Sequence, residues 1–185
     1  MTRLLAGSLM MLLTLADVRP IYGQSIDTAR STITVHVGKT GLFSAAGHEH
    51  SVSAPISNGA ISIGERRVWF EIESARMTVL DEKDRDAIQS TMQNKVLESS
   101  TFPVIRFESS SVQNAGGGKL TVVGNLTLHG RTKSIVVSVR EEGGEYLGET
   151  QVKQTDFGIE PVSAAGGTIK IKNELKVEFK IYMKH

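Results

Sequence analysis

The chain has no cysteine among its 185 residues, which excludes disulfides and thiolate metal sites. Its fold must therefore depend on burial of apolar side chains and on sheet hydrogen bonds. An excess of charge of one sign is also lacking, because 21 basic residues stand against 20 acidic ones for a formal net charge of +1. That balance gives no electrostatic reason to expect nucleic acid or an anionic membrane surface as a partner.

No apolar run in the sequence is long enough to form a transmembrane anchor. Leu4–Ala16 is almost wholly apolar, but it is shorter than the roughly 20 residues that a membrane-spanning helix needs. With a positive charge before it and polar residues after it, this run is typical of an export signal. We expect cleavage after Gly23, or alternatively after Ala16, which leaves one mature domain at 24–185 in the periplasm of a bacterium or outside the cell. The absence of cysteine excludes lipoprotein attachment at that residue.

Alternation of apolar and polar residues dominates the rest of the sequence. Between Leu120 and Leu128 every second residue is apolar or glycine, and Leu175 to Ile181 alternate with charged residues in the same way. A period of two with one apolar face predicts β-strands that cover something apolar. Further strands are predicted at 33–37, 60–63, 68–72, 135–139, 145–154 and 168–173, with another beginning at Pro103. One segment, 81–97, lacks glycine and proline and has helical spacing, so we predict a single helix there.

About eight strands with short turns and one helix predict an all-β fold, either an antiparallel barrel or a sandwich, with the helix as a lid or plug. A barrel of roughly eight strands is either filled by its own side chains or holds one small ligand. The alternation alone leaves both alternatives open. Polar groups are scarce on the inner face, which favours a hydrocarbon over a sugar or nucleotide, because each buried methylene contributes about 0.8 kcal/mol without a polar partner.

Several motifs occur in a characteristic order along the chain. They are KDRD at 83–86, FPVIRFES at 102–109, GNLTLHGRTKSI at 124–135, TDFGI at 155–159 and NELKVEF at 173–179. In this order they resemble the YceI-like family of exported bacterial proteins, over essentially the whole mature chain. The resemblance implies an eight-stranded, lipocalin-like antiparallel barrel whose interior holds a polyisoprenoid or a fatty-acid-like chain. It implies no catalytic reaction and no obligatory cofactor.

The predicted ligand-binding residues are inward-facing apolar side chains. Those beside the matched motifs follow from the resemblance, the others on strands follow from alternation, and two more would face the barrel from the helix. The three groups are Ile105, Phe107, Leu126, Leu128, Val137, Phe157 and Ile159; Val35, Val37, Phe70 and Ile72; and Met92 and Leu97.

Histidines form the one polar pattern that a hydrocarbon-binding barrel leaves unexplained. In the sequence GHEH, His48 and His50 point to the same side if the segment is extended. Two imidazoles at this spacing can share a divalent metal when a further ligand arrives, for which His129 and His36 are candidates. Two alternatives remain: the pair hydrogen-bonds locally in a loop, or it binds a ligand headgroup and changes charge near pH 6 to 7.

The sequence thus predicts a binding protein, not an enzyme, that carries, stores or protects a long-chain amphiphile. The alternatives are a metal-dependent enzyme or redox partner that uses His48 and His50, and a scavenging protein without a specific ligand. We expect no nucleic acid partner and no integral membrane span once the signal is removed. A homodimer remains open.

Overall fold

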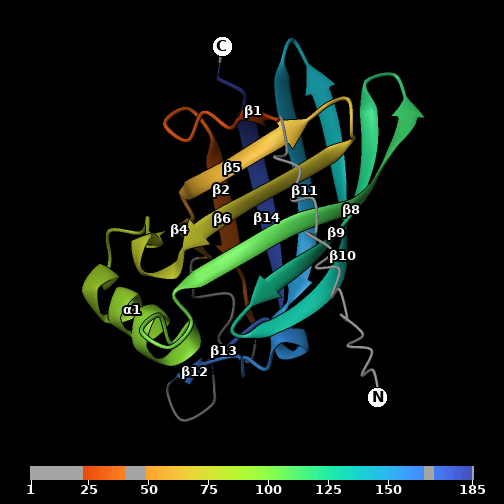
Figure 1. Cartoon of the computed structure of the whole chain (residues 1–185). Coiled ribbons are helices and arrows are strands. Elements are labelled where there is room, and N and C mark those ends of the chain that lie inside the picture. The colour runs from red at the N-terminus through yellow and green to blue at the C-terminus, as the bar shows by residue number, and fades with distance from the viewer. Residues whose placement is uncertain (1–22, 41–48, 165–168, 185) are drawn as a thin grey trace, which may run out of the picture.

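A computed structural model describes residues 23–40, 49–164 and 169–184 of the chain. The predicted export segment, up to residue 22, and His48 lie outside the described residues. The described residues hold an 11-stranded antiparallel sheet and a small three-stranded sheet. The sheet curls around an apolar interior (Figure 1). Its strands are β1 (Gln24–Ser25), β2 (Thr32–Val37), β4 (His50–Ser53), β5 (Ile56–Ser62), β6 (Arg67–Glu73), β7 (Thr78–Val79), β8 (Val104–Gly116), β9 (Lys119–Leu128), β10 (Arg131–Glu142), β11 (Glu145–Lys153) and β14 (Glu174–Tyr182).

The eleven strands close into a ring. Short strands that follow one another along the chain together act as one strand of the barrel. β2 pairs with β14 and β4, while β1 pairs with β5. Ile26, directly after β1, bridges Met183, directly after β14. β7 follows β6 and pairs with β4, while β6 pairs with β5. Joining β1 to β2, β4 to β5 and β6 to β7 leaves eight strands, each with two neighbours, and the predicted eight-stranded barrel is confirmed.

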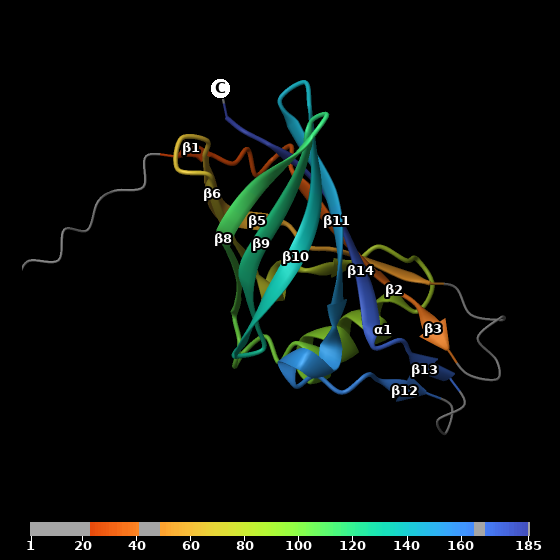
Figure 2. The same ribbon diagram turned by 90° about the vertical axis from the view of Figure 1, so that its right-hand side faces the viewer.

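One predicted strand lies outside this ring. The segment predicted at 168–173 contributes β13 (Ile169–Ile171), which pairs with β12 (Ser163–Ala164) and β3 (Lys39–Thr40) in the small sheet. This sheet lies beyond one end of the barrel (Figure 2).

Two glycines on inward positions make room for phenylalanine rings from neighbouring strands. A Cβ at Gly124 of β9 would collide with the ring of Phe107 from β8. A Cβ at Gly148 of β11 would collide with the ring of Phe179 from β14 and with the Ser138 carbonyl. In these two strands an inward position is therefore glycine, because a phenylalanine ring from the neighbouring strand occupies the space of its side chain.

The predicted helix forms, but it starts later than the sequence indicates. α1 (Arg85–Thr91) continues directly into a π-helical turn, η3 (Met92–Val96). Asp84 takes a left-handed conformation with φ of 55° and precedes the first helical residue. The Asp81 carboxylate is drawn away from the helix, because its Oδ2 accepts a hydrogen bond of 3.1 Å from the Ser51 backbone amide of β4.

Glutamine side chains fasten the helical segment to the end of the barrel. Gln89 Oε1 accepts from the Val79 amide at 2.8 Å, and its Nε2 donates to the Met77 carbonyl at 2.8 Å. Gln93 Nε2 donates to the Ser74 carbonyl at 3.1 Å, within the short 3-10 helix η2 (Ser74–Arg76). As predicted, the helical segment lies across one end of the barrel (Figures 1 and 2). Within the described ranges, no helix is long and apolar enough to cross a membrane.

Ion pairs on the outer face of β14 predict a loss of stability in acid. Lys180 lies 2.7 Å from Glu145, and Lys176 lies 2.7 Å from Glu178. Hydrogen bonds from these lysines lower the pKa of both glutamates below the ordinary value. Their contribution to the free energy of unfolding is therefore fully present at pH values above the ordinary pKa of a glutamate. It is lost as the pH falls through the lowered pKa. Because the groups are exposed, we expect a small effect.

Urea unfolding between pH 3 and pH 7 measures this effect. The free energy of unfolding of the variant with Glu145→Gln and Glu178→Gln should depend less on pH at the acid end than that of the parent. Identical pH dependence of the two proteins would contradict the assignment to these pairs.

Candidate ligand-binding site

An apolar cavity of about 380 Å³ runs through the interior of the barrel. Leu97 and Ile159 border it at the end that the helical segment covers, and Ile63, Arg66 and Glu141 border it at the opposite end, among the hairpin turns. Its size falls within the range of about 300–1,000 Å³ that is usual for small-molecule sites. The barrel is therefore not filled by its own side chains, which decides the alternative that alternation left open.

Most of the predicted ligand-binding residues border this cavity. They come from β2, β6, β8, β9, β10, the residue after η3, and the residues after the 3-10 helix η4 (Gln154–Phe157). The bordering residues are Val35, Phe70, Ile72, Leu97, Ile105, Phe107, Leu126, Leu128, Val137 and Ile159. Whether they contact a ligand stays a prediction.

Three predicted residues lie elsewhere. Val37, the last residue of β2, and Met92, at the start of η3, pack against the core without bordering the cavity. Phe157 is only 1% exposed and packs with Val152 and Ile159 in a separate cluster. It belongs to η4, where the two-residue alternation that assigns strand side chains to one face does not apply. For these three residues the expected position on the cavity wall is corrected.

The structure adds cavity residues that were not among the predicted set. Many lie on strands whose alternation already indicated an inward face, such as Val139 on β10 and Phe179 on β14. Polar residues also border the cavity, and sequence alternation gives no signal for these. They are Ser62, Arg66, Arg67, Asn114, Glu141, Tyr146, Thr150 and Gln154.

Tyr146 is the most deeply buried aromatic residue with a polar group that borders the cavity. It is 8% exposed and borders the cavity from β11. Burial raises the pKa of its phenol, and the nearby negative charge of Glu141 adds to the rise. A tyrosine phenol is neutral at pH 7 even at its ordinary pKa of about 10, so this hydroxyl can donate a hydrogen bond.

The predicted metal ligands are distributed over separate places. His50 Nδ1 lies 3.4 Å from Asp81 Oδ2, ahead of α1, whereas His129 Nε2 lies 3.3 Å from Glu98 Oε2, beyond η3. His36 Nε2 contacts Glu178 Oε2 on β14 at 3.0 Å. Among the described residues, no three side chains of histidine, cysteine, aspartate or glutamate converge on one point as metal ligands would.

This distribution corrects the expected role of His129 as a third ligand beside His50. His129 adopts a left-handed conformation, with φ of 51°, in the turn between β9 and β10, and the ring of Phe102 contacts its ring at a tilt of 53°. A metal held by His48 and His50 stays a prediction, because His48 lies outside the described residues.

Comparison with known protein families gives one match over nearly the whole described chain. Residues 24–183 match the model of the YceI-like domain. Relatives in sequence include a UPF0312 protein of Vibrio campbellii, which is 28% identical over 165 residues, or 83% of this chain and 84% of the relative. A UPF0312 protein of Shewanella denitrificans is 25% identical over the same shares.

Solved structures resemble the barrel at lower sequence identity. BcnA of Burkholderia cenocepacia matches with a TM-score of 0.60 at 19% identity, covering 84% of this chain and 98% of BcnA. A polyisoprenoid binding domain from Saccharophagus degradans matches with a TM-score of 0.62 at 15% identity, covering 86% of this chain and 96% of that domain. At such identities the likeness establishes the fold.

Proposed function

The chain belongs to the YceI-like family, and on that basis we propose that it is a binding protein for a long-chain amphiphile. The single observation that carries the proposal is the apolar cavity along the barrel axis, bordered on its length by side chains such as Val35, Phe107 and Leu126. Most of its wall is apolar, and its charged residues Arg66, Arg67 and Glu141 lie at the hairpin end, so a sugar or nucleotide would find few hydrogen-bond partners along its length. A hydrocarbon needs no such partners.

The expected ligand has either a polyisoprenoid or a fatty-acid-like chain. Burial of methylenes at about 0.8 kcal/mol each gives useful affinity to such a chain without specific polar contacts. The fold shared with a polyisoprenoid binding domain supports the isoprenoid alternative. A free fatty acid fits the same apolar wall, so the two differ in branching and length rather than in the chemistry of recognition.

We further propose that the protein is exported and that it carries, stores or protects its ligand. The signal-like residues 1–23 support export to the periplasm or the medium. In this role the protein acts by enclosing the ligand and performs no reaction on it.

Native mass spectrometry of protein purified without an affinity tag tests the proposal. We expect a mass excess that corresponds to one amphiphile per chain and that disappears after extraction with organic solvent. A chain that carries no lipid, and that takes up neither a fatty acid nor an isoprenoid alcohol, would refute the proposal. The same spectrum tests the metal: one bound metal ion per chain, lost in a variant with His48→Ala and His50→Ala, would support the metal-dependent alternative.

A further inference from the structure

The wall of the barrel is incomplete between β10 and β11. The ladder between these strands runs from the turn down to the pair Ser138 and Glu149, where it stops. Beyond that point β10 continues to pair with β9 as far as Arg131, and β11 continues to pair with β14 as far as Lys153. Each strand thus keeps its outer neighbour, while the backbone groups that face one another across the gap are not joined.

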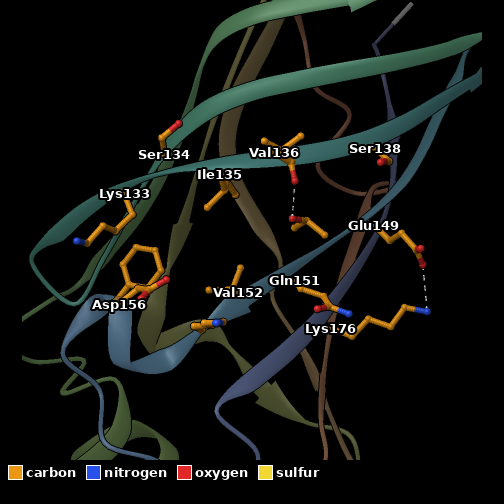
Figure 3. Close-up of a pocket in the computed structure, with 13 residues that line it drawn as sticks. Lys133, Ser134, Ile135, Val136, Ser138, Glu149, Gln151, Val152, Asp156 and Lys176 are labelled. Atoms are coloured by element: carbon orange, nitrogen blue, oxygen red, sulfur yellow. Dashed lines mark hydrogen bonds and ion pairs between the residues drawn. The ribbon is translucent and has the colours of Figure 1, made fainter. Parts of the chain in front are cut away.

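A side-chain hydrogen bond crosses the gap near the end where the ladder stops. Thr150 Oγ1 donates to the Val136 carbonyl at 2.8 Å, in place of a backbone amide (Figure 3). At the end of the gap away from the ladder, η4 lies against β10, and Phe157 of η4 borders the groove there. The opening is therefore bounded by the ladder above and by η4 below.

A groove of about 520 Å³ occupies this opening on the outside of the barrel. Its apolar part consists of Ile135, Val136, Val152 and Phe157, and Val136 is 60% exposed there. Polar and charged side chains surround that apolar part (Figure 3). They are Lys133, Ser134, Ser138, Glu149, Thr150, Gln151, Lys153, Asp156 and Lys176.

The groove and the interior cavity are separated by no more than a single layer of side chains. Ile135, Thr150 and Val152 border both of them. An apolar surface therefore continues from the interior through the wall to a polar rim. An apolar interior followed by a polar rim suits a molecule with a hydrocarbon chain and a polar end.

We propose that this groove is a lateral portal that holds the headgroup of the amphiphile whose chain occupies the barrel, and through which that ligand enters and leaves. The inference rests on the proposed function, because it assigns a place and a route to the same ligand.

The charges around the groove favour an anionic headgroup, a carboxylate or a phosphate. Lys176 lies 3.1 Å from Glu149 and 2.7 Å from Glu178, so this lysine is shared between two carboxylates and is not available to a ligand. Lys153 lies 3.9 Å from Glu174, and Lys133 forms no ion pair within the part of the chain that the structure describes. Of the remaining groove residues only Asp156 is acidic. The lower end of the groove thus has an ammonium group available to an incoming anion.

A disulfide across the gap tests the route, and the chain offers a clean background because it contains no cysteine. If the register of Ser138 and Glu149 continued, Val136 would lie opposite Gln151. A pair Val136→Cys and Gln151→Cys, once oxidised, forces the strands to within the roughly 4.4–6.8 Å between Cα atoms that a disulfide allows. The matched control is Arg140→Cys with Leu147→Cys, a pair where the strands are already joined and that borders neither the groove nor the cavity.

The probe is cis-parinaric acid, a fluorescent polyunsaturated fatty acid, released into an excess of phosphatidylcholine vesicles. Oxidation of the Val136 and Gln151 pair should slow release at least tenfold relative to the same protein after reduction. Oxidation of the control pair should change release less than twofold. Equal release rates before and after oxidation would overturn the portal and assign passage to the hairpin end of the barrel.

Two further variants keep the test decisive if the disulfide does not form. Thr150→Val removes the hydrogen bond across the gap and should speed release severalfold, whereas an unchanged rate counts against the portal. Lys133→Gln should weaken binding of parinaric acid and of a long-chain alkyl phosphate severalfold without affecting the methyl ester of parinaric acid. Equal weakening of all three would overturn the anionic headgroup. A parent protein that binds none of the probes would refute the proposed function itself.

Discussion

A tryptophan in place of Val139 should displace the ligand from the barrel, with a loss of affinity of about 50-fold. Val139 lies on β10, borders the cavity and packs only partly against its neighbours, so its side chain faces free space. An indole at this position would occupy space that the hydrocarbon needs. If roughly three methylenes are excluded at about 0.8 kcal/mol each, binding weakens by about 2.4 kcal/mol, which is roughly 50-fold.

Arg140→Trp is the matched control for this variant. Arg140 is the next residue of β10, is exposed, and points away from the cavity. Titration with parinaric acid should give the parental dissociation constant for Arg140→Trp and the weakened one for Val139→Trp. Circular dichroism verifies that both variants keep the sheet. Parental affinity in a folded Val139→Trp protein would show that the ligand does not occupy the barrel at this level.

The largest loss of stability is expected from Phe157→Ala. The ring is 1% exposed and fills the space between Val152 and Ile159, with Leu126 and Leu128 of β9 packed against the same cluster. Removal of a fully buried phenylalanine ring typically costs about 3–5 kcal/mol, because apolar burial is lost and a cavity remains. We expect a decrease of this size in the free energy of unfolding.

Denaturation with urea measures this loss, provided that the transition is two-state. Phe102→Ala is a matched control: the same atoms are removed from a ring that is half-buried and contacts His129 in a tilted arrangement. Its cost should be clearly smaller. Equal costs for the two substitutions would mean that Phe157 is not the centre of a packed cluster.

Alternation along single strands was enough to predict the barrel and much of its inner wall. The alternation from Leu175 to Ile181 falls within β14, and the inward residues Ile105, Leu126 and Val137 follow from a period of two on β8, β9 and β10. The reason is that burial on one face is a property that each strand carries in its own sequence.

Features that depend on how two segments meet could not be predicted in this way. Apolar residues still recur at alternate positions beside the gap, at Ile135 and Val137 on β10 and at Val152 on β11, but alternation within one strand does not indicate where its pairing with a neighbour ends. The delayed start of α1 depends on a hydrogen bond from Ser51 to Asp81, 30 residues apart. The separation of His50 from His129 likewise results from the turn geometry and from the carboxylates at the two ends of the helical segment, not from residue spacing.

The closure of the ring has a consequence for how the chain folds. Ile26 is 1% exposed and donates from its amide to the Gly59 carbonyl at 2.9 Å, while Asp27 donates to the Tyr182 carbonyl at 2.8 Å. The second of these contacts, and the bridge between Ile26 and Met183, join residues about as far apart in sequence as the domain allows. Formation of such contacts requires closure of a long loop, which costs conformational entropy before any stabilising contact is gained. Proteins dominated by such contacts fold slowly. During synthesis the ring cannot close until its final strand has left the ribosome, and the apolar inner face stays accessible to a hydrocarbon until then.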